Sequence, residues 1–396
     1  MDPIRNPYSP GAGSPPPELA GRDEVIETVR IATERIRLCR VSQSVVMVGL
    51  RGVGKTVLLE KMRSTAEASG IITPRIEAPE NRSLPALIAP QLRQALLKLS
   101  LTTRAKDKAR RALRALTGFV TAMKLKYEDI EVGLDYDPEP GLADNGDLDH
   151  DLQVLMETVG MAARDGETAV ILFVDELQYV EESQLAALIM ALHRAAQQSL
   201  PISLVGAGLP QIRGQLGRAK SYAERLFTFP MIGPLDKTAA RIAIVKPAEE
   251  EGVNIAPEAF DLLYQKTQGY PYFLQEWGKH SWNVAENSHI TKQNVMDASR
   301  LALASLDESF FRVRFDRLTP SERKYLRAMG ELGAGPHRSG DIAKVLGRSV
   351  QSFGPVRNQL VSKGMIWSPN HGDTAFTVPL FDQFLHRVMP GADWEA

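Results

Sequence analysis

The sequence predicts an α/β fold with a parallel sheet between layers of helices, followed by a helical part and a smaller C-terminal part. Three observations support this fold class. Short apolar runs rich in β-branched residues alternate with helical periodicity up to about residue 232, which is typical of a parallel sheet covered on both faces. Between about residues 236 and 305 the apolar residues keep helical spacing alone. The length of 396 residues exceeds that of one ordinary domain and indicates two or three.

The expected elements of the sheet follow one another along the chain. A helix over residues 24–40 precedes SVVMV at 44–48, a β-branched run that predicts a buried strand. A second helix over 55–69 ends at Gly70, since glycine commonly terminates helices. The other expected elements of the sheet are strands near 71–78, 170–176, 201–208 and 226–232, and a helix over 183–198.

Two segments depart from this alternation. Residues 1–17 are rich in proline, glycine and serine, which predicts a disordered tail. Residues 104–126 hold eight Lys or Arg and one acid, whereas residues 127–151 hold ten acids and no Lys or Arg. We interpret residues 104–151 as a solvated insertion whose two halves neutralise each other; an arm that touches DNA or a partner is the alternative.

The composition excludes several classes of protein. A hydrophobic content of 43%, a charged content of 24% and a formal net charge of -1 are near globular averages, so the chain is neither disordered nor uniformly basic. The single cysteine, Cys39, rules out an internal disulfide, and the seven histidines lack the spacing of metal ligands. No apolar run suits a membrane helix, and the amino terminus lacks a signal-peptide pattern. We therefore expect a cytoplasmic protein with no membrane association.

Residues 49–56, GLRGVGKT, match the phosphate-binding pattern Gly-x-x-x-x-Gly-Lys-[Ser/Thr]. The motif follows an expected strand and opens an expected helix, as this chemistry requires. Its glycines let backbone N–H groups face a phosphate, while Lys55 adds a cation and Thr56 a hydroxyl ligand for Mg²⁺. The expected nucleotide contacts are Gly49, Leu50, Arg51, Gly52, Val53, Gly54, Lys55, Thr56 and Val57.

An acidic pair ends another expected strand. In VILFVDE, apolar residues carry Asp175 to the end of a buried strand, the edge at which open α/β sheets bind ligands. Asp175 is suited to hold Mg²⁺, and Glu176 is suited to polarise an attacking water as a general base. Together with the phosphate loop, this pair predicts an ATPase that uses ATP and Mg²⁺.

These motifs resemble those of the AAA+ ATPases, in the branch that looks like origin-recognition initiators and approaches the STAND signalling ATPases. PPPELAGRDEVI at 15–26 resembles the entry segment of that family, which implies that Gly21 and Arg22 lie near the adenine. The resemblance implies a P-loop AAA+ domain over residues 18–233 and a helical lid over 234–308. YAERLF falls where an arginine finger often lies, so Arg225 is the candidate for completing the ATP site of a neighbouring subunit in a homo-oligomer. Completion of the ATP site by a partner protein is the alternative.

Two motifs depart from the family pattern. SLVGAGLP occupies the place of sensor I, but Gly206 stands near the position where the family has a polar side chain. GYPYFLQ resembles the lid motif in the Gly-x-Pro form of the STAND relatives, which makes Pro271 a nucleotide contact by resemblance and leaves out the sensor II arginine. Both departures imply a slow, switch-like ATPase.

Residues 309–396 predict a winged helix. Three short helical patterns begin at Thr319, and an extended hairpin with a turn near Asn370 follows them. Residues 321–363 hold eight Lys or Arg against three acids. Such modules commonly insert the third helix into the major groove and set the wing on the backbone. The expected contacts to double-stranded DNA are Arg348, Ser349, Gln351 and Ser352 near the bases, and Lys344, Arg357, Lys363 and His371 at phosphates.

Taken together, the motifs predict a molecular switch in which the nucleotide state controls DNA binding by the winged helix. The alternative is a STAND-like signalling or scaffold ATPase whose last domain binds protein and whose ATP site is a conformational latch. A helper ATPase for transposition or phage defence would show the same motifs.

Overall fold

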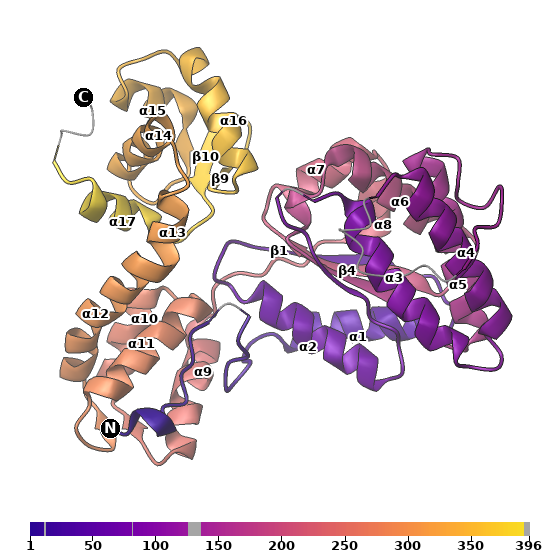
Figure 1. The fold of residues 1–396 in the computed structure, drawn as a ribbon. Coiled ribbons are helices and arrows are strands. Elements are labelled where there is room, and N and C mark those ends of the chain that lie inside the picture. Colours follow the sequence, from indigo (N-terminus) through magenta and orange to yellow (C-terminus); the bar gives the residue numbers. More distant parts are fainter. Residues whose placement is uncertain (12, 81, 126–135, 392–396) are drawn as a thin grey trace. The chain divides into compact units, whose positions relative to one another are not determined.

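The computed structural model describes residues 1–11, 13–80, 82–125 and 136–391. The chain divides into two compact units, each with its own hydrophobic core, and Figure 1 shows their elements. Unit 1 comprises Met1–Arg22, Gly49–Gly54 and Ile232–Ala396, and unit 2 comprises Asp23–Val48 and Lys55–Met231.

Unit 2 is built on a five-stranded parallel sheet with the strand order β2-β3-β4-β1-β5. Strands β1, β3 and β4 are buried along their whole length, as expected for central strands covered on both faces. The strands are β1 (Ser44–Val48), β2 (Arg75–Glu77), β3 (Val170–Asp175), β4 (Ile202–Gly208) and β5 (Phe227–Thr228). The α/β fold class predicted from the sequence is confirmed, although β5 is shorter than expected.

Helices cover both faces of this sheet, with α1 and α2 on one face and α3 to α6 on the other (Figure 1). Val46, Leu172 and Val174 pack in one apolar cluster with side chains of α3 to α6, since alternate residues of a strand point to the same face. The helices of unit 2 are α1 (Asp23–Arg37), α2 (Lys55–Ala68), α3 (Leu84–Ser100), α4 (Lys106–Ala122), α5 (Leu148–Asp165), α6 (Glu182–Gln197), α7 (Ile212–Ala219), α8 (Ala223–Leu226) and the 3₁₀ helix η3 (Leu177–Tyr179).

The basic half of the expected insertion over residues 104–151 is part of the core. Its helix α4 is contacted by α3 and α5, and Ala112, Leu116 and Phe119 are buried at helical spacing. The interpretation of residues 104–126 as a solvated insertion is therefore wrong for the described residues, because Lys and Arg fill only the outer side of an amphipathic helix. Residues 126–135, which include the first part of the acidic block, lie outside the described residues.

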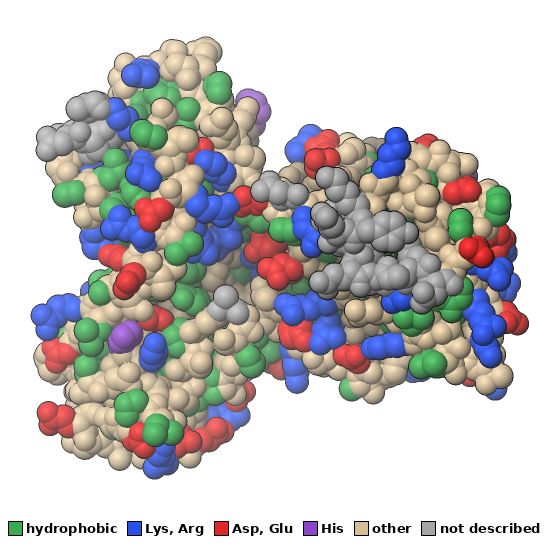
Figure 2. All heavy atoms as spheres, viewed as in Figure 1, with side chains coloured by type: hydrophobic (Ala, Val, Ile, Leu, Met, Phe, Trp, Pro, Cys, Tyr) green, Lys and Arg blue, Asp and Glu red, His purple; other side chains and the backbone are tan. Residues whose placement is uncertain are grey.

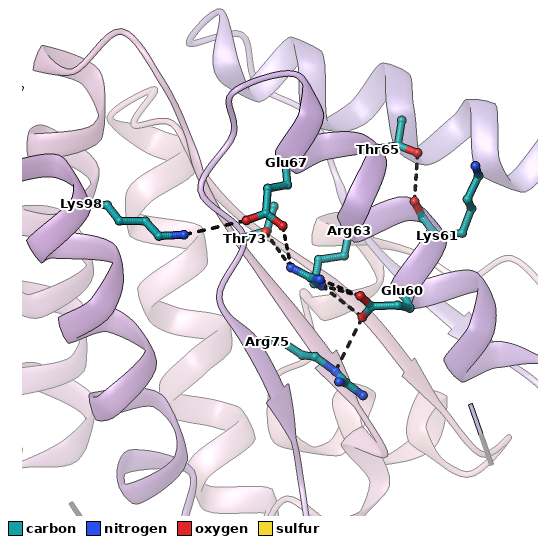
Figure 3. A network of polar contacts seen from close by, with 8 residues as sticks. All are labelled: Glu60, Lys61, Arg63, Thr65, Glu67, Thr73, Arg75 and Lys98. Atoms are coloured by element: carbon teal, nitrogen blue, oxygen red, sulfur yellow. Dashed lines mark hydrogen bonds and ion pairs between the residues drawn. The ribbon is translucent and has the colours of Figure 1, made fainter. Parts of the chain in front are cut away.

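A network of charged side chains ties α2 to β2 and α3 (Figure 3). Arg63 pairs with Glu60 at 2.6 Å and with Glu67 at 2.9 Å, and Glu60 also lies 3.7 Å from Arg75 on β2. Lys98 of α3 lies 3.8 Å from Glu67. Single exposed pairs add little stability, but a shared network limits how α2 can move against its neighbours. The middle and the end of α2 are thereby tied to β2 and α3.

The helical part of unit 1 contains the long helices expected after residue 233. They are α9 (Lys237–Glu250), α10 (Pro257–Thr267), α11 (Pro271–Val284) and α12 (Lys292–Leu306), and the short parallel strands β6 (Asn254–Ile255) and β7 (His289–Ile290) join their loops. Trp277 and Trp282 are buried, and Trp277 Nε1 donates a hydrogen bond to Ser299 at 3.0 Å. Both tryptophans therefore serve packing.

The amino-terminal segment is docked on these helices. Tyr8 is buried and its hydroxyl donates a hydrogen bond to Ile244 O, while Trp282 Nε1 donates to Asp2 O at 2.9 Å. Residues 3–5 form the 3₁₀ helix η1 (Pro3–Arg5). The prediction that residues 1–17 form a disordered tail is therefore wrong for the described ones. The side chain of Tyr8 packs into the core, which the proline-rich composition does not indicate.

The C-terminal part of unit 1 combines short helices with a three-stranded antiparallel sheet of order β8-β10-β9. A π-helical turn η4 (Asp307–Phe311) leads into this part. The ring of Phe311 packs against those of Phe310 and Phe384. The remaining elements are α13 (Arg312–Phe315), α14 (Pro320–Glu331), β8 (His337–Arg338), α15 (Ser339–Val345), the 3₁₀ helix η5 (Val350–Phe353), α16 (Gly354–Ser362), β9 (Ile366–Trp367), β10 (Asp373–Phe376) and α17 (Phe381–Val388). The domain boundaries at 233/234 and 308/309 stay predictions.

Two further properties concern only the described ranges. Among their helices, none is both long and apolar enough to pass through a bilayer. Within the same ranges, no three histidine, cysteine or acidic side chains converge as a metal cage.

Candidate nucleotide site

Thr56 and Asp175 meet in unit 2, although 119 residues separate them in the sequence. Thr56 lies in the first turn of α2, and Asp175 is the last residue of β3. Thr56 Oγ1 donates a hydrogen bond to Asp175 Oδ2 at 2.6 Å. Lys55 and Asp175 are both buried, with 8% and 5% of their surface exposed. The fold thus brings together the hydroxyl, the carboxylate and the ammonium group that the two sequence motifs predicted.

The environment of Asp175 fits a magnesium ion. Burial raises the pKa of Asp175, the hydrogen bond from Thr56 lowers it, and the charge of Glu176 raises it again, with a net upward shift. Asp175 Oδ1 also accepts a hydrogen bond from the Glu176 N–H at 2.9 Å. A carboxylate beside a threonine hydroxyl is the hard oxygen donor set that Mg²⁺ prefers, so Thr56 and Asp175 would hold the ion. When bound, Mg²⁺ would neutralise phosphate charge there.

Glu176 has an unusual backbone and a held side chain. Its φ of 54° and ψ of 37° place it in the left-handed region, which non-glycine residues seldom adopt and which recurs at functional sites. Gln178 Nε2 donates a hydrogen bond to Glu176 Oε2, and Gln178 Oε1 accepts one from the Leu209 N–H at 2.9 Å. Gln178 was not among the residues predicted from the sequence. Its only signal was an amide two residues after the acidic pair.

The glycine-rich half of the motif, Gly49–Gly54, lies in unit 1. Gly52 and Gly54 have φ values of +78° and +88°, which side chains other than that of glycine rarely permit. A Cβ atom at Gly49 would lie 2.2 Å from Ile232 O, so close that the backbone would have to move. The three glycines therefore meet steric demands of the loop conformation.

Arg22 reaches this half of the loop, whereas Gly21 meets a helix. Arg22 Nη2 donates hydrogen bonds to Val53 O at 3.4 Å and to Gly233 O at 2.5 Å. At Gly21, with a φ of +66°, a Cβ atom would lie 2.6 Å from Ala239 Cβ on α9. These contacts explain why an arginine and a glycine suit these two positions, and the contact of both residues with adenine stays a prediction.

Two backbone hydrogen bonds join the loop to distant parts of unit 1. The Tyr272 N–H donates to Gly52 O at 3.2 Å, and the Arg51 N–H donates to Thr377 O at 3.0 Å. Pro271, the predicted nucleotide contact of the lid motif, occupies the first turn of α11, where its ring is compatible with the helix. Thr377 follows β10, so the loop also contacts the C-terminal part of the chain.

Arg225 lies on α8 and is exposed. Its carbonyl accepts a hydrogen bond from Gln43 Nε2 at 2.9 Å, which fixes the backbone next to β1. Its action as an arginine finger stays a prediction.

The predicted DNA contacts fall into two groups. Arg348, Ser349, Gln351, Ser352 and His371 are exposed, and the first four precede α16 rather than lying on it. Lys344 is exposed too but pairs with Asp341 at 3.0 Å. Figure 2 also shows Lys and Arg side chains around the part of unit 1 that contains α13.

Arg357 and Lys363 bind other residues of their own domain, which departs from their expected contact with phosphate. Arg357 donates to Thr374 Oγ1 at 3.1 Å and to Asp373 O at 3.3 Å, so it joins α16 to β10. Lys363 lies 2.8 Å from the buried carboxylate of Glu322. Both cations offset buried polar groups, an interaction that sequence alone does not reveal.

A hollow of about 580 Å³ lies between η5 and the loop of residues 368–372. Its lining combines aromatic and polar side chains, with Tyr325, Phe353, Arg357, Ser368, Asn370 and His371 among them. Tyr325 and Phe353 have ring centroids 6.0 Å apart. The fold therefore places two of the predicted contacts, Arg357 and His371, on one concave surface.

Two family models match the sequence. The model described as an AAA ATPase domain matches residues 18–205, a range that contains GLRGVGKT and VILFVDE. The protein is an ATPase, and residues 18–205 are similar to an AAA ATPase domain. The second model, a domain of unknown function, matches residues 308–385. The AAA match ends within β4, so Gly208, Arg225 and the predicted lid over residues 234–308 lie outside it.

Several solved structures are similar to this chain, and the first of them, with a TM-score above 0.5, supports the fold. The Walker-type ATPase of Pyrococcus abyssi is 15% identical, with a TM-score of 0.57, and the similarity covers 93% of this chain and 96% of that one. The Orc1 protein of Aeropyrum pernix in complex with DNA is 16% identical, with a TM-score of 0.47 and 94% of each chain covered. The RuvB Holliday junction branch migration motor of Thermotoga maritima is 16% identical, with a TM-score of 0.43 and coverage of 90% of this chain and 92% of that one. A comparison with curated proteins finds no match.

Proposed function

We propose that this ATPase is a slow switch, in which ATP and Mg²⁺ bound at residues 49–56 and Asp175 control the binding of double-stranded DNA by residues 309–396. The observation that carries the nucleotide site is the 2.6 Å hydrogen bond between Thr56 and Asp175. Glu176 acts as the general base in this proposal. Slow turnover is supported by the absence of a polar side chain at Gly206 and of a sensor II arginine in the lid motif.

Variants of Lys55 and Glu176 test the ATP site. Lys55→Ala should abolish tight nucleotide binding, whereas Glu176→Gln should bind ATP normally and lose turnover by a factor of about 10² or more. Lys61→Ala is the matched control, because Lys61 is an exposed lysine on the same helix. Fluorescent ATP binding and phosphate release measure the two properties separately. Unchanged turnover in Glu176→Gln would remove the assigned general base.

Contacts of the loop support coupling to the C-terminal part. The hydrogen bonds from Tyr272 N–H and Arg51 N–H join the loop to segments that lie more than 200 residues further along the chain. Each is worth about 1 kcal/mol net, so losing both would shift an equilibrium by roughly 30-fold. A nucleotide that favours another loop conformation has this free energy available for moving the C-terminal part.

Binding to random duplex DNA, measured by fluorescence anisotropy across a salt series with and without ATP and Mg²⁺, tests the DNA proposal. Binding should weaken with salt and depend on nucleotide, and Arg348→Glu should reduce the salt slope by about one unit for a lost phosphate contact, or more if neighbouring contacts are repelled. Lys292→Glu is the charge-matched control, since Lys292 is exposed at the start of α12. Equal losses in both variants would show a nonspecific charge effect.

A protein partner for the C-terminal part is the second candidate function. The observation that favours it is the apolar side of the hollow, where Val350 is 44% exposed beside Phe353 and Tyr325. In this case no DNA binding would be seen in any nucleotide state, and Val350→Asp would release a co-purifying protein.

We further propose that Arg225 completes the ATP site of a neighbouring copy. Its exposure on α8 supports this role. Arg225→Ala should lose turnover alone, and mixing it with Glu176→Gln should restore part of the activity, because mixed pairs contain one complete site. No restoration at any mixing ratio would refute action between subunits.

A further inference from the structure

We propose that Gln178 is a positioning residue for Glu176. The inference rests on the proposed role of Glu176 as the general base. All residues that carry it lie in unit 2, on β3, η3, β4 and the loop after β4.

Two glycines of β4 make room for η3. Gly206 and Gly208 are two residues apart on one strand, so their missing side chains face the same side of the sheet. A Cβ atom at Gly206 would lie 2.3 Å from Leu177 Cδ1, and one at Gly208 would lie 3.1 Å from Gln178 Oε1. Leu177 and Gln178 therefore occupy the space in which a sensor side chain of β4 would stand.

The partners of the Gln178 amide fix its orientation. The Leu209 N–H can only donate, so the oxygen Oε1 must face it, at 2.9 Å. The nitrogen Nε2 then faces Glu176, where it donates a hydrogen bond to the carboxylate oxygen Oε2. The side chain is 6% exposed, so neither bond competes freely with water. Reversal of the amide would leave both partners facing a group that cannot bind them.

This arrangement connects the base to the end of β4. The left-handed backbone turns Glu176 out of β3, and the amide then restricts its carboxylate to one direction. The carbonyl of Gln178 accepts a hydrogen bond from Gln215 Nε2 of α7 at 3.2 Å, so the same residue also contacts the helix that follows β4. Gln178 thus fixes Glu176 relative to the end of β4 and to α7. A general base needs a fixed position of this kind in order to act on its water.

Gln178→Glu separates positioning from packing. In its ionised form, the new carboxylate can still accept the Leu209 N–H, but it cannot donate to Glu176. Gln178→Met loses both hydrogen bonds at similar volume. Gln184→Glu is the matched control, because the Gln184 amide also joins a glutamate, Glu181, to a backbone N–H, that of Leu84, at 3.2 Å and 2.7 Å.

Steady-state ATP hydrolysis, ATP affinity and the urea midpoint are measured for the full-length variants. We expect both Gln178 variants to lower kcat by about 10- to 100-fold with ATP affinity within twofold of wild type, and Gln184→Glu to leave both unchanged. Adding Gln178→Met to Glu176→Gln should cause little further loss, because the two residues act as one unit.

The outcomes distinguish this inference from the function on which it rests. If Glu176→Gln keeps wild-type turnover, the proposed general base fails. If Glu176→Gln loses turnover while a folded Gln178→Glu variant matches wild type, only the positioning role is overturned. A rise in kcat in Gln178→Glu would also overturn it, since the amide would then restrain the base instead of positioning it.

Discussion

Replacing Gly206 with alanine tests whether Leu177 fills the space above β4. The added Cβ would stand 2.3 Å from Leu177 Cδ1 and 3.1 Å from Leu204 Cδ2, so the buried Leu177 must move within a packed core. Overpacking of this kind costs about 1–3 kcal/mol, and the entropy gained on replacing a strand glycine offsets about 0.5–1 kcal/mol. We expect Gly206→Ala to lower the free energy of unfolding by roughly 1–2 kcal/mol.

A double-mutant cycle identifies Leu177 as the cause. Leu177→Ala alone should cost about 2–5 kcal/mol, since Leu177 is 1% exposed. The double variant should be about 1–2 kcal/mol more stable than the sum of the single losses predicts, because the alanine at 206 then meets empty space. Urea unfolding followed by far-UV circular dichroism gives all four free energies. Additivity within about 0.5 kcal/mol would refute the contact.

Two further predictions concern unit 1. Gly269→Ala should cost about 1–3 kcal/mol more than Gly252→Ala, because both glycines have a left-handed backbone, with φ of +74° and +76°, but only at Gly269 would a Cβ lie 2.2 Å from Leu235 O; unfolding followed by tryptophan fluorescence measures the difference, and equal losses would contradict it. Burial raises the pKa of Glu322, but the hydrogen bonds from Lys363 and Thr319 outweigh it, so the folded pKa is below the ordinary value. Its contribution to stability is therefore present above about pH 4 and lost as the pH falls through the folded pKa, and Glu322→Gln should flatten the acid side of a profile of Tm against pH; an unchanged slope would count against the pairing.

The sheet of unit 2 could be predicted because its signals are local. VILFVD is a continuous apolar run that ends in an acid, and it forms β3 with every residue buried. The phosphate motif carried its own context, a strand before it and a helix after it, and both exist as β1 and α2. Such patterns can be recognised from the sequence because each depends only on the few residues of its own strand or helix.

The misjudged segments depend on contacts that composition does not show. The basic residues of α4 suggested solvation, yet Ala112 and Phe119 between them form a buried face against α3 and α5. Proline near the amino terminus suggested disorder, yet Tyr8 finds a buried place beside Gly278, where a Cβ would lie 2.8 Å from the tyrosine ring. In both cases a few apolar residues outweigh the average character of the segment.

A missing motif residue has to be interpreted together with the space around it. From the sequence, Gly206 indicated only that a polar sensor was absent. In the fold, the same glycine admits Leu177, and the next turn brings Gln178 to Glu176 and to the Leu209 N–H. A polar side chain at 206 would displace Leu177 and with it the amide that follows. The glycine at 206 and the position of Gln178 therefore depend on each other. An asparagine at 206 should weaken the hydrogen bond between Gln178 and Glu176 and should not increase ATP turnover.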